Sequence, residues 1–317
     1  MINSKTSWLF VLLGLQMTLT LTIFAYEKST TGSIDVKPLI PTEAEVIDEL
    51  VISDNAGELR LNKTEGGWVI PALGGLAANE IKLTTVLSDL LNLKSDWPVA
   101  SATGSRSRFE VAEDKFNRRV DLLSSNANVG RIYVGTSPGF KKSHVRLDGQ
   151  KNIYSLALNA YDFPTEPADW LDKSLISVQN ISSIEGLDFK LVSKNREWSL
   201  ISTENEVEAE SIVEVNKENA NALDMALKTL TVLSVADKDV NLADSKSFRL
   251  EVFAPNQITF TFFEKEDKYY VTRSGIDKIF TLSKFNFDKL SNQNLTTLSE
   301  PDTDKTPVTP AGQSNSD

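Results

Sequence analysis

The sequence predicts an α+β protein in which an N-terminal transmembrane helix precedes two tandem repeats, each an antiparallel sheet with one main packed helix. Two internal matches indicate the duplication. Residues 145–156, VRLDGQKNIYSL, return as residues 271–282, VTRSGIDKIFTL. Residues 59–70 likewise match residues 189–200, with a tryptophan at the same place in both. The third observation is an uncharged apolar run near the N-terminus, which predicts a helix outside the repeats.

Composition fits a globular protein with room for two domains in its 317 residues. The net charge of -11 argues against nucleic acid as a partner, because phosphate binding rests on clustered Lys and Arg. The arginines within residues 106–119 are interleaved with acidic residues and form no such cluster in the sequence. The absence of cysteine excludes disulfides, thiolate metal sites and a cysteine nucleophile, and it fits an oxidising compartment.

The N-terminal run extends from Trp8 to Tyr26 without a charged residue. As a helix rising about 1.5 Å per residue, it is long enough to cross the ~30 Å hydrocarbon layer of a bilayer. Trp8 and Tyr26 stand at the two predicted membrane interfaces, and Lys5 marks residues 1–7 as the cytoplasmic side. Two alternatives remain: a signal peptide cleaved near Ala25, and a helix buried in a soluble body.

A polar linker is predicted over residues 27–42, followed by the first repeat over residues 43–174. The glycines before Trp68 predict a β-hairpin turn, and a leucine stripe at helical spacing predicts the main helix. Short alternating segments then predict an antiparallel meander. The stripe consists of Leu83, Leu87, Leu90 and Leu93, and the meander begins at Val120, Arg131, His144 and Asn152.

The second repeat is predicted over residues 175–297, and residues 298–317 are predicted to be a disordered tail rich in proline and poor in apolar groups. Its leucine stripe matches the first one position by position. The stripe consists of Leu223, Leu227, Leu230 and Leu233, and the meander strands begin at Phe248, Ile258, Tyr269 and Lys278.

The two repeats differ in two loops. The second gains an acidic segment at residues 204–215, and the first alone carries residues 101–108, SATGSRSR. Differences between otherwise similar units are where we expect any asymmetric function.

The order of these segments resembles the bacterial family called domain of unknown function 4340. The resemblance rests on Gly66-Gly-Trp68, the leucine helix, Ile132-Tyr-Val-Gly135, His144-Val-Arg146 and Ile153-Tyr-Ser-Leu156. It covers Val46 to about Ser174 well and the second repeat more weakly. At residues 108–111, RFEV, the chain departs from a Tyr/Phe-Gly-Leu turn that is usual in the family, which places the geometry of that loop in doubt.

The resemblance implies an exported, membrane-anchored protein that is often encoded beside ABC transporter parts similar to gliding-motility auxiliary components. It implies no catalytic residues. We therefore expect a single-pass protein of the bacterial inner (cytoplasmic) membrane, with its C-terminal body in the periplasm or outside.

The sequence contains few residues suited to chemistry. His144 is the only histidine and is predicted to be a surface residue of a strand. Neither a Gly-x-Ser-x-Gly elbow nor a phosphate-binding glycine loop occurs, so we expect no nucleotide and no cofactor. Two groups of carboxylates remain candidates for acid/base catalysis, although surface charge explains them better. They are Glu110, Glu113 and Asp114, and Asp162, Glu166 and Asp169.

Two further hypotheses concern ligands and partners. The acidic segment could hold Ca²⁺, but it lacks the residue spacing of a calcium loop. Trp68 and Trp198 occupy equivalent positions and are predicted to pack in the two cores. Trp97 and Trp170 lack clear counterparts, so they are the candidate aromatic anchors for a partner, with packing in the core as the alternative for each.

The function we expect is that of a non-enzymatic, membrane-anchored accessory protein of an ABC-type transport or envelope assembly system. Its partner would be an integral membrane or transporter protein. The alternatives are an envelope module that binds a peptide or polysaccharide, and a carboxylate-dependent hydrolase.

Overall fold

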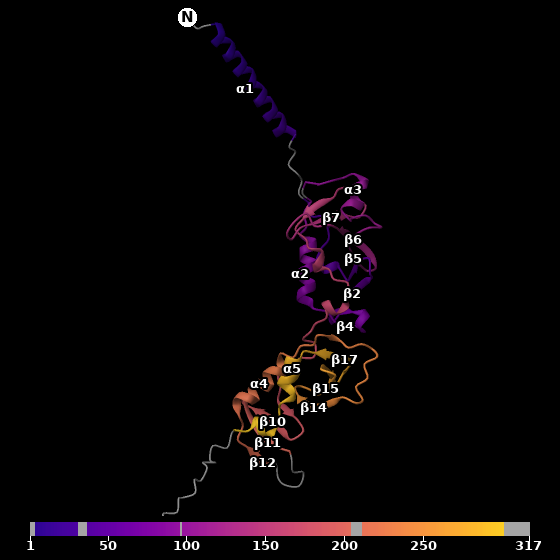
Figure 1. Ribbon diagram of the computed structural model, residues 1–317, viewed down its shortest axis with the longest axis vertical. Helices are drawn as coiled ribbons and strands as arrows, with labels where there is room; N and C mark the ends of the chain where they lie inside the picture. The colour runs from indigo at the N-terminus through magenta and orange to yellow at the C-terminus, as the bar shows by residue number, and fades with distance from the viewer. Residues whose placement is uncertain (1–3, 31–36, 96, 204–210, 301–317) are drawn as a thin grey trace, which may run out of the picture. The chain divides into compact units, whose positions relative to one another are not determined.

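A computed structural model describes residues 4–30, 37–95, 97–203 and 211–300 (Figure 1). The chain forms two compact units, one of Met1–Gly66 with Ile81–Thr165 and the other of Gly67–Glu80 with Glu166–Asp317. Most of the acidic segment and most of the predicted tail lie outside the described residues. The bounds predicted for the linker, the two repeats and the tail stay predictions.

The N-terminal helix α1 extends over Ser4–Thr30. Its large apolar side chains are exposed, from 39% at Leu12 to 71% at Leu15. The hydroxyls of Thr18 and Thr20 donate to the carbonyls of Gly14 and Gln16, each at 2.8 Å, so these polar groups are satisfied within the helix. No helix formed by the described residues combines the length and the apolarity needed to cross a membrane.

The first sheet is antiparallel and has eight strands over the described residues, in the order β4-β3-β2-β1-β5-β6-β7-β8. The chain therefore builds two hairpin ribbons outward from the central pair β1 and β5. The strands are β1 Glu49–Ser53, β2 Glu58–Thr64, β3 Gly67–Ile70, β4 Leu76–Ala77, β5 Arg118–Ser124, β6 Ala127–Val134, β7 Ser143–Leu147 and β8 Tyr154–Leu156.

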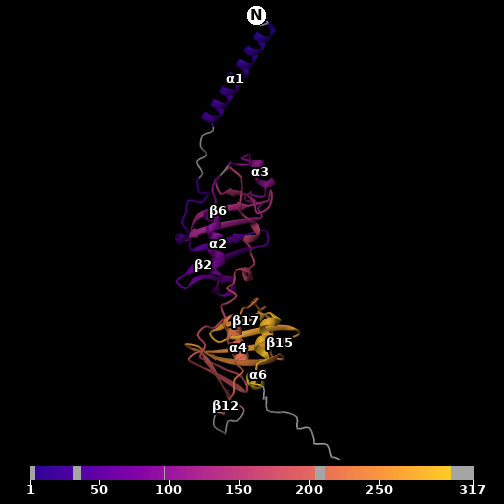
Figure 2. The same ribbon diagram turned by 90° about the vertical axis from the view of Figure 1, so that its left-hand side faces the viewer.

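One face of the first sheet is apolar. Because side chains alternate along a strand, residues that stand opposite one another in the ladder share a face. The leucine stripe of helix α2, Glu80–Leu91, is buried, and α2 lies along this sheet in both views (Figures 1 and 2). The strand residues of this face are at most 1% exposed: Leu50, Ile52, Leu59, Leu61, Val120, Leu122, Ile132, Val134 and Val145.

The second sheet has the order β12-β11-β10-β9-β14-β15-β16-β17-β13 over the described residues. Its first eight positions repeat the order of the first sheet, and β13 adds a short edge strand. The tandem antiparallel sheets that the sequence predicts are thus confirmed. The strands are β9 Ser183–Glu185, β10 Phe189–Lys194, β11 Glu197–Ser202, β12 Ser211–Val213, β13 Ser234–Val235, β14 Lys246–Phe253, β15 Gln257–Lys265, β16 Lys268–Arg273 and β17 Ile276–Leu282.

Three helices accompany the second sheet: α4 Lys217–Lys228, α5 Lys284–Ser291 and α6 Leu295–Leu298. Helix α4 packs against α5, α6 and β11, and α5 packs against β16. Asn216 caps α4 by accepting a hydrogen bond from the Asn219 amide at 3.0 Å. Phe260 and Phe262 are fully buried in this unit.

The predicted leucine stripe of the second repeat needs one correction. Leu223, Leu227 and Leu230 are at most 1% exposed, as expected. Leu233 is 50% exposed, because α4 ends at Lys228, five residues before it, whereas α2 ends at Leu91, only two residues before Leu93. Leu93, the matching residue of the first repeat, is 6% exposed, so the burial of the two leucine stripes differs at their last position.

We predict that Leu227→Ala lowers the free energy of unfolding of the second unit by roughly 2–5 kcal/mol, since it removes buried methyl groups and leaves a cavity. Leu233→Ala is the matched control and is expected to change it by at most about 0.5 kcal/mol. Urea unfolding of the full chain in detergent, followed by circular dichroism, measures both. Equal losses in the two variants would contradict the placement of Leu233.

Candidate functional site

The second face of the first sheet is polar but largely buried. Tyr133 of β6 stands opposite Arg146 of β7, and Asp121 of β5 stands opposite Arg131. Arg146 is 0% exposed, Tyr133 is 3% exposed and Asp121 is 4% exposed. A covering segment must therefore shield this face from water and supply partners for its polar groups.

Residues 99–116, the cover segment, close the β6–β8 side of this face. They contain the short helix α3, Thr103–Arg108, and they include the residues that the first repeat carries and the second lacks. Val111 forms a small hydrophobic cluster with Tyr133 and Ile153, and Phe109 and Phe116 pack against this cluster. The Val99 amide donates to the Ile153 carbonyl, and the Ile153 amide donates to the Ala100 carbonyl, each at 2.8 Å. The segment therefore closes over the outer face of the sheet.

Gly135, which directly follows β6, permits the closest approach of the cover segment to the sheet. A Cβ atom at this position would lie 2.6 Å from the Glu110 carbonyl oxygen and still closer to that of Phe109. The Thr136 amide donates to the same Phe109 carbonyl at 2.9 Å. Glu110 has a φ of 56°, which turns the chain sharply here. This is the turn at which the sequence departs from the Tyr/Phe-Gly-Leu pattern.

Arg146 ties the cover segment to the sheet. Its Nε donates to the Val111 carbonyl at 2.7 Å and its Nη1 donates to the Gln150 carbonyl at 3.3 Å. The guanidinium lies over the Tyr133 ring, 4.4 Å from the ring centroid. Burial and the neighbouring charge of Arg106 lower the pKa of Arg146, but an arginine starts so high that it stays charged at neutral pH.

His144 is buried, at 8% exposure, and the prediction of a surface residue is wrong. It lies on the covered face, where its ring packs 4.2 Å from the Phe109 ring. Burial and the charge of Arg108 lower the pKa of His144, while a hydrogen bond with Thr136 opposes the shift without reversing it. The ring is therefore neutral at pH 7 and is held at Nδ1 by Thr136, which suits packing better than proton transfer.

Charged side chains continue across the same face toward β1 and β2. Asp121 accepts a hydrogen bond from Arg119 Nε at 3.0 Å and another from Arg131 Nε. Arg119 also contacts Glu58 at 3.2 Å. These alternating charges compensate one another, so this part of the face has little unpaired charge.

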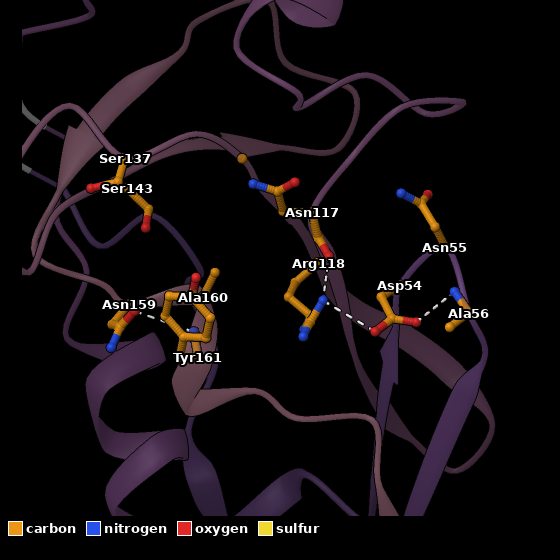
Figure 3. A pocket seen from close by; sticks show the side chains of 11 residues that line it. Asp54, Asn55, Ala56, Asn117, Arg118, Ser137, Ser143, Asn159, Ala160 and Tyr161 are labelled. Atoms are coloured by element: carbon orange, nitrogen blue, oxygen red, sulfur yellow. Dashed lines mark hydrogen bonds and ion pairs between the residues drawn. The ribbon is translucent and has the colours of Figure 1, made fainter.

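A pocket of about 490 Å³ opens in the first unit (Figure 3). Strand ends and loops supply its walls, and most of the lining side chains are polar and uncharged. The lining residues are Asp54, Asn55, Ala56, Asn117, Arg118, Gly135, Ser137, Ser143, Asn159, Ala160 and Tyr161.

An ion pair organises one wall of the pocket. Asp54 lies in the turn between β1 and β2, where its carboxylate accepts the amides of Ala56 at 2.8 Å and Gly57 at 3.0 Å. The same carboxylate pairs with Arg118 at 3.1 Å, and Figure 3 shows the two side chains in contact. Burial alone raises the pKa of Asp54, but hydrogen bonds from Ala56, Thr165 and Gly57 and the charge of Arg118 outweigh it and lower the pKa.

Tyr161 gives the pocket an exposed aromatic ring. It belongs to the short 3₁₀ helix Ala160–Asp162, which Asn159 caps through its side chain, and it is 87% exposed. An exposed ring beside amide and hydroxyl groups suits stacking and hydrogen bonding to a neutral polar ligand. No sequence motif marks this group, because Asp54, Arg118 and Tyr161 come from three distant segments.

The predicted site residues have different outcomes. Trp97 is 70% exposed, as a partner-binding anchor requires, and Trp8 in α1 is 66% exposed. Trp170 is 0% exposed, which corrects the expectation of an exposed anchor, because the 3₁₀ helix Pro167–Trp170 turns the ring into the core. The side chain of Tyr26 lies outside the described residues. The roles proposed for these residues stay predictions.

The candidate carboxylates are spread over the surface. Glu110 contacts Lys115 at 3.9 Å, and Glu113 is 66% exposed. Asp114, Asp162, Glu166 and Asp169 are exposed as well. No group of three or more acidic or histidine residues with the geometry of a metal site occurs among the described residues, and most of the acidic segment lies outside them.

A family model described as domain of unknown function (DUF4340) matches residues 68–251, which is more than half of the chain. The chain belongs to this family. No curated protein and no solved structure matches it. The family match spans α2, the cover segment and strands β5 to β8 of the first sheet, and it continues into β14 of the second.

We predict that Gly135→Ala displaces the cover segment, because the added methyl group has no room beside the carbonyls of Phe109 and Glu110. A loss of about 1–3 kcal/mol in the free energy of unfolding is expected. Gly139→Ala is the control, since no atom lies within 4 Å of the place that its added methyl group would take. Hydrogen exchange of residues 99–116 should rise in the first variant alone. Unchanged exchange in Gly135→Ala would refute the close approach.

We also predict an acid dependence of stability that involves Asp54. Its folded-state pKa is lowered, so its stabilising effect is complete above the unfolded pKa near ~3.9 and is lost as pH falls through the lower folded value. Asp54→Asn is expected to have a lower melting temperature at pH 7 and a smaller loss of stability below about pH 4. Thermal melts across this pH range measure both. Parallel curves for the two proteins would contradict the prediction.

Proposed function

We propose that this DUF4340 protein is a non-enzymatic, membrane-anchored extracytoplasmic accessory protein of an ABC-type transport or envelope assembly system. The observation that carries the proposal is the combination of one exposed apolar helix with two folded sheets of the same strand order. A helix with exposed apolar side chains favours an apolar environment, and folded modules attached to it would then work at a membrane surface.

The anchor in this proposal is the uncharged run from Trp8 to Tyr26. Its threonine hydroxyls bond within the helix, which lowers the cost of placing them in hydrocarbon. Lys5 on its N-terminal side favours a cytoplasmic N-terminus, so the two sheets would face the periplasm or the outside. In this orientation, the proposed partner is a transporter or another integral membrane protein.

The contacts of the charged residues favour a binding role over catalysis. Asp54 is tied to a turn and to Arg118, and His144 is covered by Phe109 and held by Thr136. These groups hold the loops in place instead of converging on a position where a substrate atom could react.

A second function is an envelope module that binds a peptide or polysaccharide. The pocket of the first unit favours it, because the exposed ring of Tyr161 lies beside Asn159, and Asn55 and Asn117 line the same pocket (Figure 3). Aromatic stacking together with amide hydrogen bonds is suited to both kinds of ligand.

Affinity purification of the tagged full chain from gently solubilised membranes of the producing bacterium tests the first function. We expect transporter subunits or other integral membrane proteins to be recovered with it, and we expect a variant without residues 1–26 to lose them and leave the membrane fraction. Recovery of the intact chain without any membrane protein would refute the proposal.

Tyr161→Ala separates the two functions in the same experiment. If the protein is an accessory subunit, the membrane partner should still be recovered. If the pocket captures a peptide or polysaccharide, this variant should lose the captured ligand while the control Tyr154→Phe, at a buried strand position, keeps it.

A further inference from the structure

Two arginines from distant parts of the chain meet above the first sheet. Arg146 comes from β7 and Arg106 comes from α3 in the cover segment. Both donate to the carbonyl of Gln150, Arg146 Nη1 at 3.3 Å and Arg106 Nη2 at 3.4 Å. The shared acceptor holds two positive charges next to one another, although such charges repel.

Each guanidinium keeps a buried donor without a hydrogen-bond partner. These donors are Nη2 of Arg146 and Nε of Arg106. Arg146 is 0% exposed, so its unpaired group is cut off from solvent. An unsatisfied charged donor that is buried is destabilising, and two of them in one place indicate that an acceptor belongs there.

Glu113 is the acidic residue that faces the pair among the described residues. Its Oε1 lies 3.7 Å from Arg146 Nη2 and 3.9 Å from Arg106 Nη1, which is beyond hydrogen-bonding distance. Its side chain is 66% exposed. Asp148 also attracts the charge of Arg146, but it lies 3.9 Å from Arg131. The loosely placed Glu113 is therefore the one carboxylate of the described residues within 4 Å of the two guanidinium groups, and it can swing into solvent.

We propose that Arg106 and Arg146 form a binding site for a phosphate group. A phosphate carries close to two negative charges at neutral pH and matches the two guanidinium charges, whereas a single carboxylate does not. The anion accepts hydrogen bonds from Arg146 Nη2 and Arg106 Nε and displaces Glu113. It enters past Arg106, whose side chain is 22% exposed, because Arg146 itself lies beneath the cover segment.

The site belongs to the first repeat alone. The ladder pair Tyr133 and Arg146 corresponds in the second sheet to Thr261 and Thr272, which stand opposite one another between β15 and β16. Neither threonine carries a charge, and the residues of α3 have no counterpart in the second repeat. The proposal is separate from the proposed function, since it requires neither a transporter partner nor the pocket lined by Tyr161.

Isothermal titration of the full chain in uncharged detergent with inorganic phosphate tests the site at neutral pH. We expect saturable binding that Arg106→Gln weakens by about ten-fold or more, because one charge-assisted hydrogen bond is lost. Glu113→Gln should bind more tightly, since it removes the competing carboxylate. Arg108→Gln is the matched control: it removes the same charge from the same helix, but its guanidinium lies over the Phe109 ring.

Three results would overturn the proposal. The first is that neither the wild type nor Glu113→Gln binds phosphate up to about 10 mM. The second is that Arg106→Gln binds phosphate as tightly as the wild type does. The third is that the wild type binds acetate as tightly as phosphate. Circular dichroism of each variant establishes that it is folded. Titration with glucose 1-phosphate and with a short-chain phosphatidic acid then distinguishes the source of the phosphate group. Tighter binding of one of these compounds identifies a sugar phosphate or a lipid headgroup as the ligand, and binding of inorganic phosphate alone identifies the free ion.

Discussion

An antiparallel sheet has two faces, and a polar side chain on either face can be buried only when its donors and acceptors have partners. In the first repeat the leucines of α2 bury one face completely. The other face carries Asp121, His144 and Arg146, yet all three are buried. Asp121 is satisfied by Arg119 and Arg131. The cover segment shields the other two, because Phe109 packs on His144 and the Val111 carbonyl accepts a hydrogen bond from Arg146. The fold of residues 99–116, the environment of His144 and the arginine pair all follow from the need to give these buried polar groups partners.

The two repeats show how a duplicated fold diverges. Their sheets share a strand order, and their apolar faces use the same kind of residues. They differ on the outer face, where the first has an arginine beneath the cover segment and the second has Thr272 at the same register position. A buried arginine is destabilising unless protein groups replace the water that its charge and its donors lose, so the cover segment and Arg146 depend on one another. On the outer face, the asymmetry between the repeats therefore resides in one insertion and one strand position.

Local periodicity predicted most of the fold and little of the site. The meander strands and the leucine helices follow from spacing, because alternation and helical period are properties of neighbouring residues. Leu233 and His144 were misplaced, because their exposure depends on where a helix ends or which distant segment covers them. Arg146 stands in the repeated motif, and the presence of Thr272 at the matching position was the available signal that the two repeats differ there. Gly135 stood in a family motif that did not reveal its role, and Tyr161 carried no signal, since their importance arises from carbonyls and loops far away in the chain.

The sequence by itself determined that the chain carries an apolar N-terminal helix and two sheets of common origin, because the spacing of apolar residues is enough to define them. Only the tertiary structure decided that Arg106 lies beside Arg146, that Asp54 pairs with Arg118, and that the cover segment closes on Gly135. These contacts join residues that are distant along the chain. Their formation depends on the register of the strands and on the path of one inserted segment, and neither is encoded in the local pattern of residues.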